Sequence, residues 1–125
     1  MYCSYYDIYM NEQKKYKVIY SEEVDKFLET VNEKARRKIF YNINLVAGGV
    51  IDKELFKKLD GTDIWEFRTL YNGICYRILS FWDTESKALI ITTHGFVKKT
   101  QKTPISEINR ANAIRNEYFK LKNKK

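Results

Sequence analysis

Three apolar runs in the second half of the chain, separated by turn signals, constrain its fold most. They cover residues 64–69, 74–82 and 88–94, and they are rich in the β-branched and aromatic residues that favour strands. Asn72-Gly73 lies between the first two runs, and residues 83–86 lie between the second and the third. Such short turns join neighbouring antiparallel strands. The sequence therefore predicts an antiparallel meander.

Helical signals flank this meander. A short strand at 16–20 precedes Ser21, a fair N-cap, after which apolar residues recur at helical spacing up to Gly48. Asn32 is a second cap candidate, so this region is one bent helix or a helical hairpin. Residues 52–59 predict one short helical turn. Thr103 as N-cap and Pro104 at the first helical position begin a last helix, whose apolar stripe comprises Ile105, Ile108, Ala111 and Phe119.

These elements predict an α+β fold in which a small antiparallel sheet of about four strands packs against an N-terminal helix or helical hairpin and a C-terminal helix. With 125 residues the chain suits one domain. We expect residues 1–15 to be an N-terminal extension and residues 16–125 to be the domain, ending in a basic tail at 120–125. The two cysteines are too few for a disulfide framework. Neither a signal peptide nor an apolar run of membrane-spanning length is recognisable, so a cytoplasmic protein is expected.

Positive charge is concentrated in the last quarter of the sequence. Residues 95–125 contain nine of the 23 Lys and Arg residues but only two of the 16 Asp and Glu residues. Residues 1–94 are therefore neutral overall, and the last quarter accounts for the whole net charge of +7. Such asymmetry indicates a polyanionic or acidic partner.

Side chains alternate between the two faces of a strand, so Glu66 and Arg68 are expected on the same face of theirs. From spacing alone, an exposed ion pair is a better interpretation of these two residues than a functional site. Arg77 lies in the middle of the longest run and must take the face that the helices leave open. Its planar guanidinium matches phosphate through two parallel hydrogen bonds. An arginine paired with Glu66 is an equally good interpretation.

The residues that follow the last predicted strand combine an aromatic ring with cations. His94, the single histidine, ends that strand, where it is either a site residue or a hydrogen-bonded surface group. One histidine makes a metal site improbable, and no phosphate loop, catalytic triad or cofactor motif is recognisable. Stacking rings beside cations are typical of single-stranded RNA binding, and the segment supplies Phe96, Lys98, Lys99 and Lys102.

Three sequence blocks together resemble one known family. They cover residues 59–68 (LDGTDIWEFR), 75–79 (CYRIL) and 94–104 (HGFVKKTQKTP). In this order they are similar to the RelE/HigB superfamily of type II toxins, and most to its phage-derived, HigB-like branch. The resemblance implies the RelE/ParE fold and a ribosome-dependent mRNA endonuclease. Such an enzyme works without metal or cofactor, by attack of a ribose 2′-hydroxyl on the adjacent phosphate.

The resemblance also implies residue roles and partners. Arg77 matches the family arginine and would stabilise the transition state, while Lys98 and Lys99 would bind phosphate or rRNA. Glu66 and His94 are the proton-transfer groups expected on the open face. The full expected set comprises Arg77, Glu66, His94 and Lys98 for catalysis, and Arg68, Phe96, Lys98, Lys99 and Lys102 for nucleic-acid binding. The implied partners are mRNA in the ribosomal A site, rRNA, and a cognate antitoxin of the helix-turn-helix, HigA-like kind.

Two other functions are compatible with the same fold, because fold does not determine function. One is a ParE-like toxin that binds a protein target, DNA gyrase. The other is an inactive RNA-binding or antitoxin-sequestering module, for which the basic tail alone would be sufficient.

Overall fold

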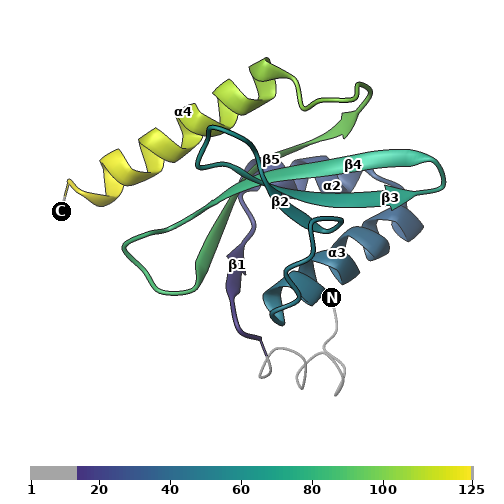
Figure 1. Cartoon of the computed structure of the whole chain (residues 1–125), viewed down its shortest axis with the longest axis horizontal. Helices are drawn as coiled ribbons and strands as arrows, with labels where there is room; N and C mark the ends of the chain where they lie inside the picture. The colour runs from purple at the N-terminus through teal and green to yellow at the C-terminus, as the bar shows by residue number, and fades with distance from the viewer. Residues whose placement is uncertain (1–13, 125) are drawn as a thin grey trace.

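The computed structural model describes residues 14–124, so most of the predicted extension and Lys125 lie outside the described residues. Along the chain the elements are β1 (Lys17–Ile19), α2 (Glu22–Thr30), α3 (Glu33–Ala47), β2 (Phe56–Lys58), β3 (Trp65–Tyr71), β4 (Ile74–Trp82), β5 (Leu89–Lys98) and α4 (Ile105–Lys122) (Figure 1). The predicted α+β class is confirmed.

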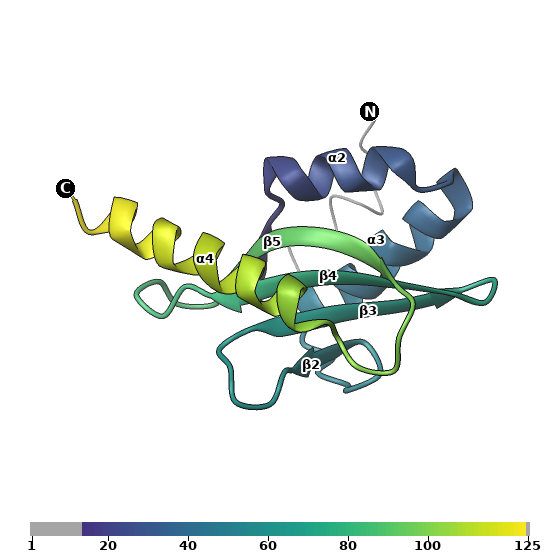
Figure 2. The same cartoon turned by 90° about the horizontal axis from the view of Figure 1, so that it is seen from above.

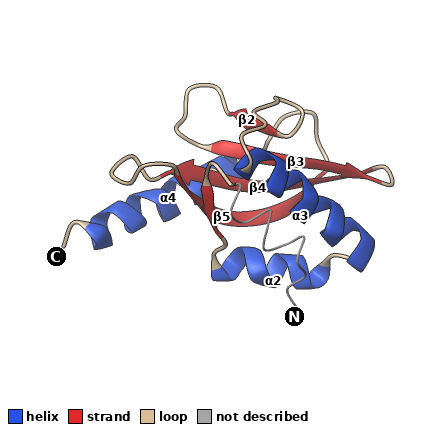
Figure 3. Cartoon of the chain, turned by 90° about the horizontal axis from the view of Figure 1, so that it is seen from below, coloured by secondary structure: helices blue, strands red, loops and turns tan. Residues whose placement is uncertain are grey.

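The strands form one sheet in the order β1-β5-β4-β3-β2. β1 runs parallel to β5, and the other neighbouring strands are antiparallel. The helices α2 and α3 cover one face of the sheet, and α4 lies against the other (Figures 2 and 3). The α4 helix packs only on part of β4 and β5, so the α4 face of the sheet is partly open.

The two N-terminal helices form a hairpin, which settles the alternative of one bent helix. Ser21 caps α2 by accepting a hydrogen bond from Val24 N at 3.1 Å, and Asn32 caps α3 by accepting one from Ala35 N at 2.9 Å. These side chains satisfy amide groups that have no partner inside the helix.

Two apolar clusters hold the layers together. One joins α2 and α3 to the sheet and includes Leu28, Ile39, Phe56 and Phe67. The other lies under α4 and is built around Ile64, Leu79, Phe81, Ile91 and Ala111. Within residues 14–124, no helix is long and apolar enough to cross a membrane.

The sheet has one strand more than the sequence predicted. Residues 56–58, expected to lie in a short helical turn, form β2, whose Lys57 pairs with Glu66 of β3. A three-residue strand has too few positions to show the alternation that identifies a strand. Its pairing with β3 decides its conformation instead.

The strand β5 is longer than predicted, because it continues past His94 to Lys98. A Cβ atom at Gly95 would lie 2.3 Å from Cδ2 of Phe27 on α2. Glycine therefore lets the helix come close to the strand rather than ending it. His94 is consequently an internal strand residue.

The helix α4 begins at Ile105 with Pro104 as N-cap residue, so the predicted cap at Thr103 is wrong. Pro104 provides no side-chain cap, and the Thr103 hydroxyl instead donates to Glu66. Ile105, expected in the apolar stripe, is 73% exposed, whereas Ala111 is buried.

Asp83 attaches the C-terminal part of α4 to the β4–β5 turn. Its buried carboxylate accepts hydrogen bonds from Tyr118 Oη at 2.5 Å and Lys122 Nζ at 2.6 Å. Burial alone would raise the pKa of Asp83, but the hydrogen bonds from Lys122, Tyr118 and the Glu85 backbone, and the Lys122 charge, lower it to about 2. Lys122 is therefore bound to the domain and is not part of a solvated tail.

Candidate active site

Strand register gathers charged side chains on the α4 face of the sheet. Because the Asn72-Gly73 turn joins β3 to β4, Arg68 lies opposite Arg77. On the other side of β4, Arg77 pairs with Phe96 and Cys75 pairs with Lys98. Side chains alternate between faces along each strand, so Glu66, Arg68, Arg77, Phe96 and Lys98 all point toward the α4 side.

Glu66 is the carboxylate at the centre of this group and is only 2% exposed. Its Oε1 lies 3.2 Å from Nε of Arg77 and 3.4 Å from Nε of Arg68. Its Oε2 accepts the hydroxyl of Thr103. The proposed pairing of Arg77 with Glu66 is thus present, and the pair is buried rather than exposed.

The two arginines are not fully satisfied by this arrangement. Arg77 N–H donates to the carbonyl of Tyr76 at 3.1 Å, and Arg68 N–H donates to the carbonyl of Lys53 at 3.0 Å. Among the described residues, however, the Nε atoms of both arginines are buried without a hydrogen-bond partner, since the ion-pair contacts with Glu66 are poorly aligned. A buried donor without an acceptor costs about 1–3 kcal/mol. An anionic ligand would remove that cost.

A cleft of about 330 Å³ opens beside this cluster. Its lining includes Glu66, Arg68, Lys98, Lys102 and Thr103, together with Lys57 from β2. Burial lowers the pKa of Lys98, and the positive charges of Arg77 and Arg68 lower it further against the opposing effect of Glu66. Four cationic side chains thus line the cleft against two carboxylates, of which Glu66 is buried and Asp60 is exposed, so the cleft is cationic overall.

His94 lies outside this cleft, contrary to its predicted place at an open strand end. It is 1% exposed, with Nε2 2.9 Å from Oε1 of Glu107 on α4 and Nδ1 3.1 Å from Oγ1 of Thr93. Burial lowers the pKa of His94, although Glu107 opposes the shift. The imidazole therefore connects β5 to α4.

The remaining predicted residues occupy the margin of the site. Phe96 is half-buried against the cluster under α4, with its ring centroid 6.0 Å from that of His94. Lys99 and Lys102 are exposed on the segment that leads from β5 to α4, and Lys102 lines the cleft. The structure thus brings Glu66, Arg68, Arg77, Lys98 and Lys102 together.

Thr103 and Lys57 are among the residues of the cleft that the sequence did not identify. Thr103 has the position and residue type of a helix cap, which conceals its role at Glu66. Lys57 lies in β2, where the sequence predicts a helical turn. Within residues 14–124, no three His, Cys, Asp or Glu side chains are grouped so that they could hold a metal ion.

Comparison with known sequences identifies a protein family that matches most of the chain, including this site. The family described as "Phage derived protein Gp49-like (DUF891)" matches residues 26–116, a range that contains every residue of the cleft. The chain belongs to this Gp49-like family. Comparison of the Gp49-like chain with curated proteins finds no match.

The fold of the Gp49-like protein is similar to that of the Escherichia coli toxin RelE, in a structure of a double arginine-to-alanine mutant in the free state. The TM-score is 0.56, with 17% sequence identity over 80% of this chain and 96% of that chain. The three sequence blocks predicted both a phage-derived family and a RelE-like fold, and the family match and the structural similarity agree with them.

Proposed function

We propose that this Gp49-like toxin is a metal-independent endoribonuclease that cleaves mRNA in the ribosomal A site and so inhibits translation. The observation that carries the proposal is a cationic cleft lined by Arg68 and Lys98, whose buried Glu66 also contacts the buried Arg77 at 3.2 Å. In the proposed reaction the arginines bind the phosphate, and Glu66 takes a proton. Ribosome dependence and cytoplasmic action rest on the resemblance of the sequence blocks.

The chemistry begins at Glu66. When RNA enters, its 2′-hydroxyl takes the place of the Thr103 hydroxyl at Oε2 and gives its proton to the carboxylate. The 2′-oxygen then forms a bond to the adjacent phosphorus. Arg77, with Arg68, stabilises the negative charge that develops on the phosphoryl oxygens.

Cleavage is completed when the bond from phosphorus to the 5′-oxygen breaks. The leaving oxygen takes a proton from Lys98, whose lowered pKa makes its ammonium group a better acid. The products are a 2′,3′-cyclic phosphate and a free 5′-hydroxyl. In this scheme His94 positions α4 and touches no reacting atom, Phe96 stacks on a base, and Lys99 and Lys102 bind flanking phosphates or rRNA.

We also propose a cognate antitoxin of the helix-turn-helix, HigA-like kind as the partner that silences this activity. The cationic cleft would suit an acidic segment of that partner, because opposite charges speed and orient association.

Primer extension on mRNA in a translating extract tests the proposal. The wild type should produce cuts within codons that need translating ribosomes, and Arg77→Ala should abolish them. Arg37→Ala is the matched control, because Arg37 is an exposed arginine of α3 whose ion-pair partner in the described part of the chain is Glu33, at 2.6 Å. Circular dichroism melting of each variant shows whether it is folded.

Four results would contradict the proposal or the role that it gives to Arg77. Intact mRNA with the wild type would remove the nuclease assignment, and arrest of DNA replication before translation would favour a ParE-like gyrase toxin. RNA binding without cleavage would favour a non-catalytic module. A folded Arg77→Ala protein with full activity would show that the role of Arg77 is wrong.

A further inference from the structure

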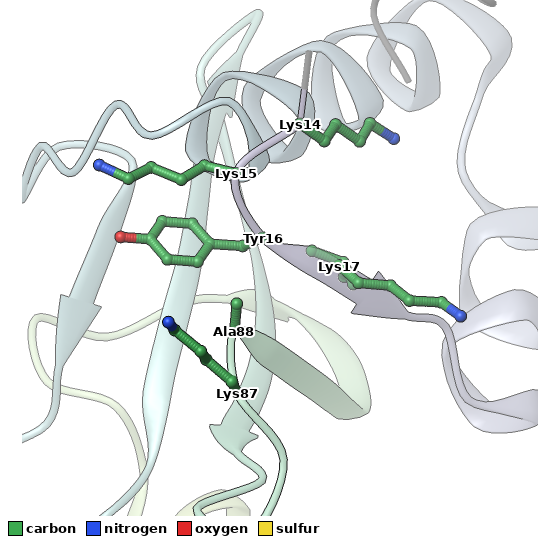
Figure 4. Close-up of a pocket in the computed structure, with 7 residues that line it drawn as sticks. Lys14, Lys15, Tyr16, Lys17, Lys87 and Ala88 are labelled. Atoms are coloured by element: carbon green, nitrogen blue, oxygen red, sulfur yellow. The ribbon is translucent and has the colours of Figure 1, made fainter. Parts of the chain in front are cut away.

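A second cationic site lies at the other end of β5 from the cleft. A cavity of about 540 Å³ is formed between residues 14–18 and the end of the β4–β5 turn. It is lined by Lys14, Lys15, Tyr16, Lys17, Val18, Lys87 and Ala88 (Figure 4), and we call it the lysine pocket. Ala88 precedes the first residue of β5 and Lys98 is its last, so at about 3.3 Å per residue the two sites are roughly 30 Å apart.

The lysine pocket has four ammonium groups and no carboxylate in its lining. Within residues 14–124, none of the four lysines forms an ion pair, and all four are exposed. Lys15 and Lys87 lie on the same side of the strand (Figure 4), and their like charges repel each other. An anion between these two ammonium groups relieves the repulsion.

The backbone that carries these lysines is fixed in place. The amides of Lys15 and Tyr16 both donate to the carbonyl of Ala47 at the end of α3, at 2.7 and 2.8 Å. The amide of Lys17 donates to the carbonyl of Ala88 at 2.9 Å. Ala88 itself has φ of 61°, a left-handed conformation that costs a residue with a Cβ atom about 1 kcal/mol or more. The pocket is thus formed before any ligand arrives.

An aromatic ring lies among the cations. Figure 4 shows the ring of Tyr16 between the side chains of Lys15 and Lys87, whereas Lys14 and Lys17 extend to the other side of the strand. The opposite edge of the Tyr16 ring packs on Trp82, with centroids 5.1 Å apart and the planes at 82°. The ring is therefore held rigidly while remaining half-exposed.

We propose that the lysine pocket binds the phosphate backbone of RNA, with phosphates at Lys15 and Lys87 and a base or ribose against Tyr16. A ring flanked by cations is the arrangement that single-stranded RNA uses. All four cations are lysines, which act on phosphate as mobile point charges. The choice of RNA as the polyanion rests on the proposed function; the anion site rests on the geometry alone.

The pocket's role is to anchor the RNA-bearing target away from the reacting phosphate. Contacts with phosphates position a protein on its nucleic acid without reading the sequence. A second set of such contacts, roughly 30 Å from the first along β5, would fix the orientation of the toxin on a large RNA surface. A small substrate that occupies only the cleft would not need it.

Fluorescence anisotropy with a labelled RNA hairpin carrying a single-stranded tail tests the proposal. The RNA is 2′-O-methylated, so that it has no attacking hydroxyl and binding is measured apart from cleavage. The double variant Lys15→Gln/Lys87→Gln should weaken binding by on the order of tenfold at low salt. The slope of log affinity against log salt should fall by about 1.4, since each phosphate contact on a single strand contributes about 0.7.

The matched control is Lys34→Gln/Lys53→Gln, which removes the same charge from two exposed lysines outside both sites. It should keep most of the affinity and of the salt slope. Equal losses in both double variants would overturn the proposal, because net charge alone would then explain binding. Binding of labelled poly-glutamate is measured in the same way. If Lys15→Gln/Lys87→Gln loses poly-glutamate binding but keeps RNA binding, the proposal is overturned in favour of an acidic polypeptide ligand. Retained RNA binding at the lysine pocket by a protein that cuts no mRNA would remove the nuclease function and leave the pocket as an RNA site.

Discussion

Replacement of Glu66 by glutamine tests the central electrostatic claim about the cleft. Oε1 lies 3.2 and 3.4 Å from the Nε atoms of Arg77 and Arg68. At an effective dielectric constant of about 20, each contact represents about 5 kcal/mol of gross attraction. Much of that offsets the cost of burying the charges, and loss of one partner from a buried pair typically destabilises by about 3–5 kcal/mol. Glutamine keeps one acceptor oxygen, so we expect Glu66→Gln to lower the free energy of unfolding by about 3 kcal/mol.

The same variant should bind anions more tightly. Without the Glu66 carboxylate, Arg68 and Arg77 lose the negative charge that each contacts, and the exposed Asp60 is the carboxylate that remains in the lining of the cleft. Added phosphate should therefore raise the stability of Glu66→Gln more than that of the wild type, since a ligand that binds only the folded state stabilises it more when it binds more tightly. Cleavage should be lost at the same time, because the proposed base is absent.

Urea denaturation followed by tryptophan fluorescence measures both effects, with and without phosphate. Glu33→Gln is the control, because Glu33 pairs with Arg37 at 2.6 Å but both side chains are mostly exposed. Such a pair is worth about 0.3–0.5 kcal/mol. If Glu66→Gln costs no more than this control, or if phosphate stabilises both proteins equally, the description of the cleft as a charge-balanced anion site is refuted.

Three further predictions concern other contacts. Because the pKa of Asp83 falls from 3.8 to about 2 on folding, its stabilising contribution is present above pH 4 and is lost as the pH drops toward 2; Asp83→Asn should remove this part of the acid unfolding curve, and an unchanged curve would contradict it. Thr103→Val should change cleavage and its pH profile, because Glu66 loses a hydrogen bond that Thr103→Ser keeps; equal profiles for both variants would exclude a role for the hydroxyl. Gly95→Ala should lower the unfolding free energy by about 1–3 kcal/mol through a clash with Phe27, and a melting temperature equal to that of the wild type would disprove this close approach.

The sequence was sufficient to predict four of the five strands and the three helices, because these elements depend on short-range signals. The Asn72-Gly73 turn fixes which residues of β3 and β4 lie opposite one another, and the caps at Ser21 and Asn32 mark where α2 and α3 begin. Alternation also predicted that Arg77 lies on the face that the helices leave open. Arg77 does lie opposite α2 and α3, but α4 covers part of that face. The turn register alone would have placed Arg68 opposite Arg77.

Other features depend on tertiary contacts that leave no local pattern. His94 is buried because α4 crosses that part of β5 and presents Glu107 to it, and no spacing in the sequence shows where a helix will cross. Thr103 does not cap α4, because its hydroxyl donates to Glu66, which lies 37 positions earlier in the sequence.

The sequence does not reveal the lysine pocket for a related reason. The net charge of residues 1–94 is zero, so a charge count along the sequence conceals a local excess. Lys87 joins Lys14, Lys15 and Lys17 only because β1 pairs with β5.

The parallel pairing of β1 with β5 also determines when the molecule is complete. Lys17 pairs with Leu89, and Ser21 reaches Thr93 across 72 positions. Closing a loop of that length costs about 4 kcal/mol of chain entropy. β1 has only three residues whose pairing with β5 can offset this cost. We therefore expect β1 to be the last strand to join the sheet and the first to leave it in native-state hydrogen exchange. The lysine pocket exists only while that strand is closed, so an anion bound there should be detected as slower exchange of the β1 amides.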